Sequence, residues 1–141
     1  MTDESLTIGW NEAQVSKTRT AYRLVLGVNL VLHLLIGLFC IVHPTGVAEF
    51  FGLPDPIPSG WTRGWGAMLI LVTALYVPGW LEPDICRSPN IIGILGRFWM
   101  GTIWMFCAGG FLWFAAFDYF FAVVLALLYW RFLRAVLMSR P

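Results

Sequence analysis

The amino-acid sequence predicts an all-α, polytopic membrane protein with four transmembrane helices in one bundle. Hydrophobic residues make up 59% of the 141 residues and charged residues only 12%, whereas a soluble domain has about 25% charged residues. A chain this short has too much surface for its volume to hide so many apolar side chains from water. The composition therefore excludes a disordered chain, a nucleic-acid-binding protein and an ordinary cytosolic enzyme. The lipid bilayer is the first predicted partner.

Four apolar runs have roughly the 20 residues that cross a bilayer, within a single membrane domain that covers residues 1–141. Each run must be a helix, because a backbone in lipid finds no water for its polar groups. Turn-forming residues mark the ends of the runs, such as Pro78-Gly79 at the end of the second run and Gly109-Gly110 at the end of the third. The predicted spans are approximately residues 24–42, 61–80, 91–111 and 114–137.

Two segments outside these spans also have predicted structure. In the tail formed by residues 1–23, Asn11 and Gln14 stand at the spacing of a capping box. This spacing predicts a helix that begins near residue 11 and continues into the first span. The outer loop, residues 43–60, is rich in proline, and its segment 46–51 is expected to form a short helical turn on the membrane surface.

The lysine and arginine residues predict the orientation of the spans. Eight of the nine lie on one side of the predicted membrane, and only Arg63 lies on the other. Since positive loops remain in the cytoplasm, we expect both termini in the cytoplasm and the chain in the bacterial inner membrane. This orientation also defines the two membrane–water interfaces. Four residues are expected there, at the level of the lipid headgroups: Trp61, Trp80, Trp130 and Arg131.

A polar stripe runs along the first predicted span. Asn29, His33 and Cys40 share one helical face at 100° per residue, and such a face must meet protein or a cavity. We interpret His33 and Asn29, with the mid-span Trp104, as a candidate contact for a quinone or another small ligand. The alternative is hydrogen bonding between helices. Bound pigment or lipid remains open, but no recognisable motif for a cofactor is present.

Three ionisable residues are expected to need partners in the membrane, because a charge is costly there. Asp118 stands at the start of an apolar run that is shorter than the bilayer, and we predict that it pairs with Arg63. Arg97 is expected to extend to the inner headgroups or to pair with an acidic residue of the loop before it. A contact with another subunit or with a lipid phosphate is the alternative for Arg97.

The sequence contains no catalytic or metal-binding motif. It lacks the nucleophile, zinc and nucleotide-binding signatures, and its three cysteines form no C-x-x-C pair. Aromatic residues crowd the third and fourth spans, where they suit packing against other transmembrane subunits or lipid. We therefore expect a non-catalytic accessory or scaffold subunit of a larger membrane complex, for example an electron-transfer or light-harvesting complex. The alternatives are a quinone-binding protein and an oligomeric channel or carrier.

Several short motifs follow one another in a familiar order. Arg63 opens the second span after a proline-rich loop, Tyr76-Val-Pro follows, and then come an Asp84-x-x-Arg87 loop and Gly96-Arg97. Over roughly residues 24–135 this layout resembles the small four-helix bacterial membrane proteins of the DoxX-like kind. The resemblance implies a four-helix fold and a role beside oxidoreductase or quinol-oxidase systems. It transfers no functional residues, because the cysteines needed for thiol redox chemistry are missing.

Overall fold

A computed structural model describes the backbone of residues 3–139 and the side chains of residues 12–139. Within this part of the chain the regular structure is entirely helical, and no strand occurs. Four helices are long and apolar enough to cross a membrane, which agrees with the predicted multi-pass class. The helices are α1 (Asp3–Val42), α2 (Pro44–Phe51), α3 (Gly60–Leu81), α4 (Arg87–Cys107), the 3₁₀ turn η1 (Gly109–Phe111) and α5 (Leu112–Met138).

The first helix is longer than predicted. α1 contains 40 residues without a break, so it continues into the first span as expected. It begins at Asp3 rather than near residue 11, and the capping side chain of Asn11 lies outside the described side chains. At 1.5 Å per residue α1 is about 60 Å long, twice the roughly 30 Å of a hydrocarbon layer. Its first turns therefore extend beyond any membrane that its apolar part crosses.

The third long helix ends four residues before the predicted boundary. α4 stops at Cys107, and φ is 56° at both Ala108 and Gly109. A positive φ cannot continue a right-handed helix, so the chain reverses here, and α5 follows after the turn η1. The short helical turn expected over residues 46–51 is present as α2, which ends on Gly52 in the left-handed conformation typical of helix ends.

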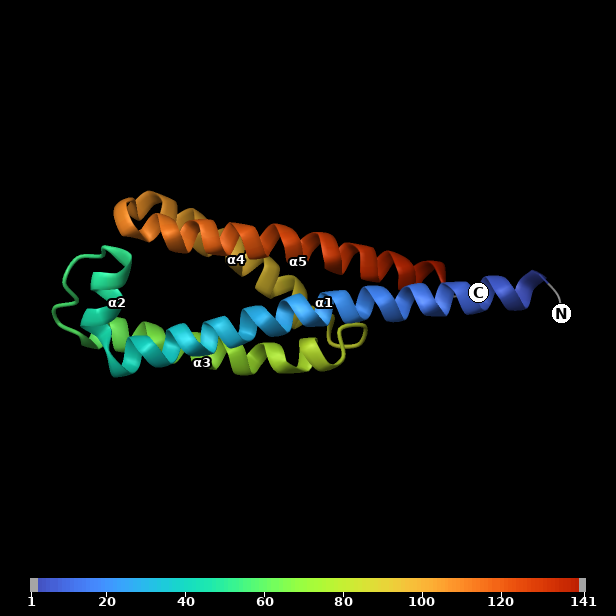
Figure 1. Cartoon of the computed structure of the whole chain (residues 1–141), viewed down its shortest axis with the longest axis horizontal. Coiled ribbons are helices and arrows are strands. Elements are labelled where there is room, and N and C mark those ends of the chain that lie inside the picture. The colour runs from blue at the N-terminus through green and yellow to red at the C-terminus, as the bar shows by residue number, and fades with distance from the viewer. Residues whose placement is uncertain (1–2, 140–141) are drawn as a thin grey trace.

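The long helices are arranged in the cyclic order α1, α3, α4, α5 (Figure 1). Packing is closest between α1 and α3 and between α4 and α5, and it is sparsest between α3 and α4. The start of α1 and the end of α5 lie at one end of the molecule, which we call the terminal end, while α2 lies at the other (Figure 1). α1 and α4 are therefore diagonal neighbours, and only long side chains can join them.

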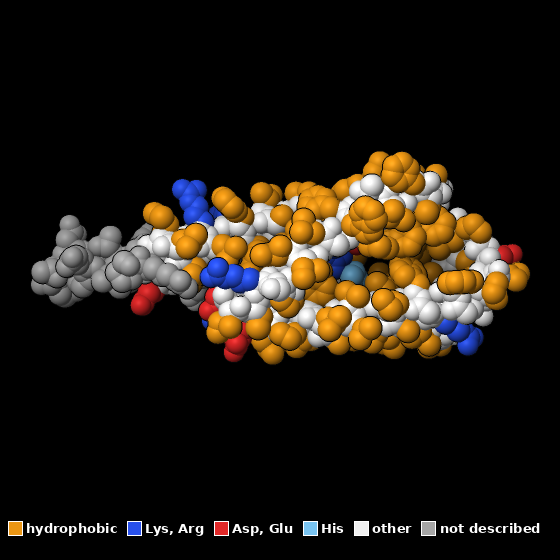
Figure 2. All heavy atoms as spheres, turned by 180° about the vertical axis from the view of Figure 1, so that it is seen from behind, with side chains coloured by type: hydrophobic (Ala, Val, Ile, Leu, Met, Phe, Trp, Pro, Cys, Tyr) orange, Lys and Arg blue, Asp and Glu red, His pale blue; other side chains and the backbone are white. Residues whose placement is uncertain are grey.

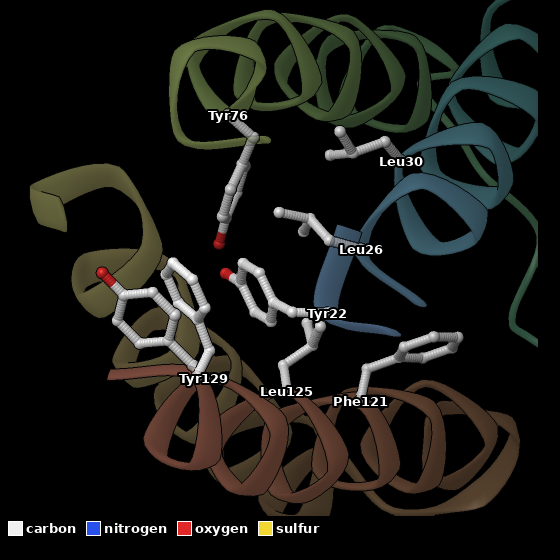
Figure 3. Close-up of a cluster of buried hydrophobic side chains, with 8 residues drawn as sticks. Tyr22, Leu26, Leu30, Tyr76, Phe121, Leu125 and Tyr129 are labelled. Carbon is white, nitrogen blue, oxygen red and sulfur yellow. The ribbon is translucent and has the colours of Figure 1, made fainter. Parts of the chain in front are cut away.

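The main cluster of buried hydrophobic side chains joins α1 to α5 toward the terminal end. Tyr22 and Leu26 of α1 meet Leu125, Tyr129 and Phe132 of α5, all of them buried. The rings of Tyr22 and Tyr129 lie 5.0 Å apart, centre to centre. Figure 3 shows the side chains of α1 and α5 pointing into one shared core, with Tyr76 of α3 reaching toward Tyr22.

α1 and α3 approach each other through two glycines. A Cβ atom added to Gly66 would lie 2.5 Å from the carbonyl oxygen of Gly37 and 2.8 Å from the side chain of Cys40. Only glycine permits such a close approach of two backbones. The pair therefore brings the face of α1 that carries Cys40 directly against α3.

The outer surface of the long helices is apolar. Large hydrophobic side chains on all four of them are exposed, and Figure 2 shows them covering most of the visible face. Surface of this extent on a monomer marks a membrane or protein contact. It suits four helices that stand in lipid.

Candidate functional site

The centre of the candidate site is Arg97, which lies on α4 and is 3% exposed. Its Nη1 atom donates a hydrogen bond to Oδ1 of Asp118 on α5 at 3.1 Å, and the two charges form a buried ion pair. The partner of Asp118 is therefore Arg97 and not Arg63, whose side chain is exposed near the start of α3. This corrects the predicted pairing. Arg97 reaches Asp118 because α4 and α5 pack against each other.

Arg97 also reaches across the diagonal to α1. Nη2 donates to the amide oxygen Oδ1 of Asn29, and Nη1 and Nη2 each lie 3.2 Å from Nε2 of His33. The expectation that Arg97 extends to the headgroups is wrong, because its side chain turns inward to these acceptors. Of the acidic residues suggested as its partners, Asp84 instead lies 3.8 Å from Arg19.

The polar face of α1 supplies two members of this cluster. Asn29 is 0% exposed and His33 is 7% exposed, and Cys40 on the same face is also buried. The prediction that this stripe meets protein or a cavity is therefore confirmed. We call Asn29, His33, Arg97 and Asp118 the polar cluster.

The geometry of the polar cluster defines the proton positions on His33. A guanidinium group only donates hydrogen bonds, so Nε2 of His33 must accept and the ring proton must lie on Nδ1. This nitrogen has no partner among the described residues, and the same holds for Nδ2 of Asn29 and Nε of Arg97. All three are N–H donors. The buried atoms of the cluster that lack a partner are therefore all donors.

A cavity of about 670 Å³ lies beside the polar cluster, between α3 and α4. His33, Arg97 and Asp118 line it, whereas Asn29 lies behind them. Figure 2 shows a hollow in the apolar surface with histidine and basic side-chain atoms at its bottom. The cavity is therefore a long apolar space with one charged, hydrogen-bonding wall.

Aromatic side chains line the cavity toward its α2 end. The rings of Trp65 and Trp104 meet edge to face at 5.6 Å, and both pack against Phe114. Nearer the polar cluster, Phe117 stacks on the imidazole of His33 with centres 6.0 Å apart. Flat ring faces and edges are therefore available close to the polar wall.

The structure brings together most of the predicted ligand contacts. His33 and Trp104 both line the cavity, and Asn29 binds Arg97 directly behind it. The cavity lies between the second and third spans, and His33 of the first span lines it as well. Arg97 is the site residue that was missed. The available signal was its position four residues before Gly101, on a helical face that the structure buries.

The residues predicted at the headgroups lie on different surfaces. Trp61, Trp130 and Arg131 are exposed, as a lipid-interface role requires, and that role stays a prediction. Trp80 is half-buried, and its indole Nε1 donates to the backbone oxygen of Arg23 at 2.8 Å. Trp80 therefore connects α3 to α1.

The described side chains form no metal centre, and the chain matches no known protein. Among the described side chains, no group of three or more His, Cys, Asp or Glu residues is placed to hold a metal ion. No family model, no curated protein and no solved structure matches the chain. The cavity and the polar cluster are therefore the features of this chain that indicate a function.

Proposed function

We propose that this protein binds a lipid-soluble small molecule in the cavity between α3 and α4. The observation that carries the proposal is an apolar cavity with one polar wall, which the buried ion pair of Arg97 and Asp118 forms together with His33. Its volume of about 670 Å³ lies inside the roughly 300–1,000 Å³ range of small-molecule sites. Ligand sites commonly combine apolar walls with a few polar groups that orient the ligand. Binding, without catalysis, is the function that this arrangement supports best.

The ligand would enter from the side, through the lipid. Met68 and Leu75 of α3 and Ile92 of α4 line the cavity and are also largely exposed on the apolar surface. In a bilayer these side chains face acyl chains and not water. A molecule dissolved in the membrane can therefore reach the cavity without crossing an aqueous phase.

The shape of the cavity favours a ring with a tail. On α4 the lining extends from Ser88 to Trp104, which is about 24 Å at 1.5 Å per residue. A ring held between Phe117 and Trp104 would place its polar edge at the polar cluster. The remaining length toward Ser88 would accept an apolar chain.

The wider setting belongs to this proposal. We place the four helices as one bundle in a bacterial inner membrane with both termini in the cytoplasm, because of the strong asymmetry in lysine and arginine. The accessory-subunit function and the oligomeric channel stay predictions, as does the likeness to DoxX-like proteins. Exposed aromatic side chains serve a lipid contact as well as a protein contact, so they favour neither.

The proposal can be tested by filling the cavity. A Cβ atom added to Gly96, which lines the cavity, meets nothing within 4 Å, and the same is true of Gly64, which lies outside it. Gly96→Leu therefore puts a side chain into the cavity, and Gly64→Leu is a matched control. Two photoreactive probes with the same diazirine-bearing tail would be used in proteoliposomes, one with a naphthalene head and one with a naphthoquinone head.

We expect at least one probe to label residues of α3 and α4 saturably. Gly96→Leu should reduce this labelling at least about tenfold, the change that a lost 1.4 kcal/mol produces, and Gly64→Leu should leave it unchanged. Labelling by neither probe, or equal labelling of the two variants, would overturn the proposed function.

A further inference from the structure

We infer that the polar head of the ligand is an uncharged group whose oxygen accepts hydrogen bonds, such as the ring carbonyl of a quinone. This inference depends on the proposed function and specifies the ligand class. Three observations carry it: the donors of the polar cluster, the balance of its charges and the aromatic wall beside it.

The first observation is the surplus of donors. Nδ1 of His33, Nε of Arg97 and Nδ2 of Asn29 lack partners among the described residues, and each carries a hydrogen. Their side chains are more than nine-tenths buried, and a buried donor without a partner is costly. An acceptor oxygen that reached one of these donors would supply a missing partner, whereas a ligand that only donates would not.

The second observation is the charge balance. Arg97 already has Asp118 as its counter-ion at 3.1 Å, and His33 is the neutral acceptor of two N–H groups. A carboxylate or phosphate placed here would lie beside Asp118 in a low-dielectric environment, where like charges repel strongly. A cation would lie beside Arg97 with the same result. The pair therefore favours an uncharged head.

The third observation is the stacking surface. Phe117 lies against His33, and Trp104 lies further along the same wall. Aromatic faces and edges attract a flat conjugated ring. A ring that carries a carbonyl would place the carbonyl at His33 while its face meets Phe117.

His33 and Arg97 are the members of the cluster that can contact the head directly. Both residues line the cavity, and each has a buried N–H group without a partner among the described residues. Side-chain rotations of the kind that commonly accompany binding would expose these groups to an oxygen. Asn29 would act behind them by positioning Arg97.

The first test compares head groups on the unmodified protein. Labelling by the naphthoquinone probe would be competed with free 2-methyl-1,4-naphthoquinone, with 1,4-dimethylnaphthalene and with decanoic acid, each corrected for its partition into the vesicles. We expect the quinone to compete at least about tenfold better than the hydrocarbon, the ratio that about 1.4 kcal/mol produces. Equal competition by the hydrocarbon, or better competition by the acid, would overturn the inference.

The second test changes the donor. His33→Gln keeps an acceptor for Arg97 and an N–H donor for the ligand, whereas His33→Leu removes both. His43→Leu is the control, because His43 is exposed near the start of α2 and does not line the cavity. We expect His33→Leu to reduce naphthoquinone labelling about three- to tenfold, as a lost hydrogen bond does, with His33→Gln and the control near the unmodified protein.

The outcomes separate the two proposals. If a probe labels the cavity saturably but the hydrocarbon competes as well as the quinone, the binding function stands and the head-group inference fails. If no probe labels the cavity, the proposed function itself fails. Should His33→Leu not fold, the head-group competition on the unmodified protein still decides the inference.

Discussion

The interfaces of α1 and the interface between α3 and α4 differ in how they use side-chain size. Along α1, large residues such as Leu26 fit against Phe132 and Leu125, and glycines meet backbone to backbone at Gly37 and Gly66. Between α3 and α4 the helices carry small residues too, but they do not close on each other. The interfaces of α1 are therefore closely packed, whereas the interface between α3 and α4 contains the cavity.

Gly93 and Gly96 of α4 show the reason for this difference. At Gly93 the ring of Tyr76 occupies the space that a side chain would take, whereas at Gly96 nothing lies within 4 Å of an added Cβ atom. A glycine therefore permits close packing, but a partner must be present to use it. In this protein the unused space beside Gly96 is part of the cavity.

The largest expected effect comes from the buried ion pair of Arg97 and Asp118, which lies beside the cavity. Asp118→Leu leaves the buried charge of Arg97 without its counter-ion, so we expect the free energy of unfolding to fall by about 3–5 kcal/mol. Thermal or denaturant unfolding in detergent micelles would measure it. The double variant Arg97→Met with Asp118→Leu should recover most of the loss, because no charge is then buried.

The exposed pair of Arg19 and Asp84 is the control for that experiment. Arg19→Met should change the stability by no more than about 1 kcal/mol, as is typical of surface ion pairs. If Asp118→Leu were as stable as the unmodified protein, the buried ion pair would not be the connection between α4 and α5 described above.

The next effect compares a leucine-to-alanine truncation in the packed core with the same truncation at the cavity. Leu125 is 1% exposed in the core of α1 and α5, and Leu75 is 63% exposed at the cavity. Leu125→Ala should cost roughly 2–5 kcal/mol, because it leaves a hole among fixed neighbours. Leu75→Ala should cost less than about 0.5 kcal/mol, as at other surface positions. Unfolding of both variants under one condition checks the difference, and equal losses would contradict it.

The smallest effect is expected when one methyl group is added to a glycine at each of the two interfaces. Gly66→Ala forces a Cβ atom against Gly37 and Cys40, and overpacking of this kind costs about 1–3 kcal/mol. Gly96→Ala meets open space and should stabilise α4 by up to about 1 kcal/mol, because alanine favours a helix more than glycine. Thermal shifts of opposite sign are expected. A shift of the same sign and size in both would remove the distinction between the packed and the open interface.

The sequence by itself determined the local features. Four helices of membrane-spanning length follow from hydropathy, and the inward position of Asn29, His33 and Cys40 follows from helical spacing. Helix ends were less exact: α4 stops at Cys107 because Ala108 adopts a positive φ, which alanine rarely does. Such features depend on residues that are close together along the chain.

Only the tertiary structure decided which distant residues meet. Asp118 pairs with Arg97 and not with Arg63 because the rotation of α4 about its axis directs Arg97 inward, between α1 and α5. The cavity has the same origin, since it exists where α3 and α4 diverge beside Gly96. Hydropathy predicts that a helix lies in lipid. The rotation of that helix about its axis and its distance from its neighbours depend on how all four helices pack together.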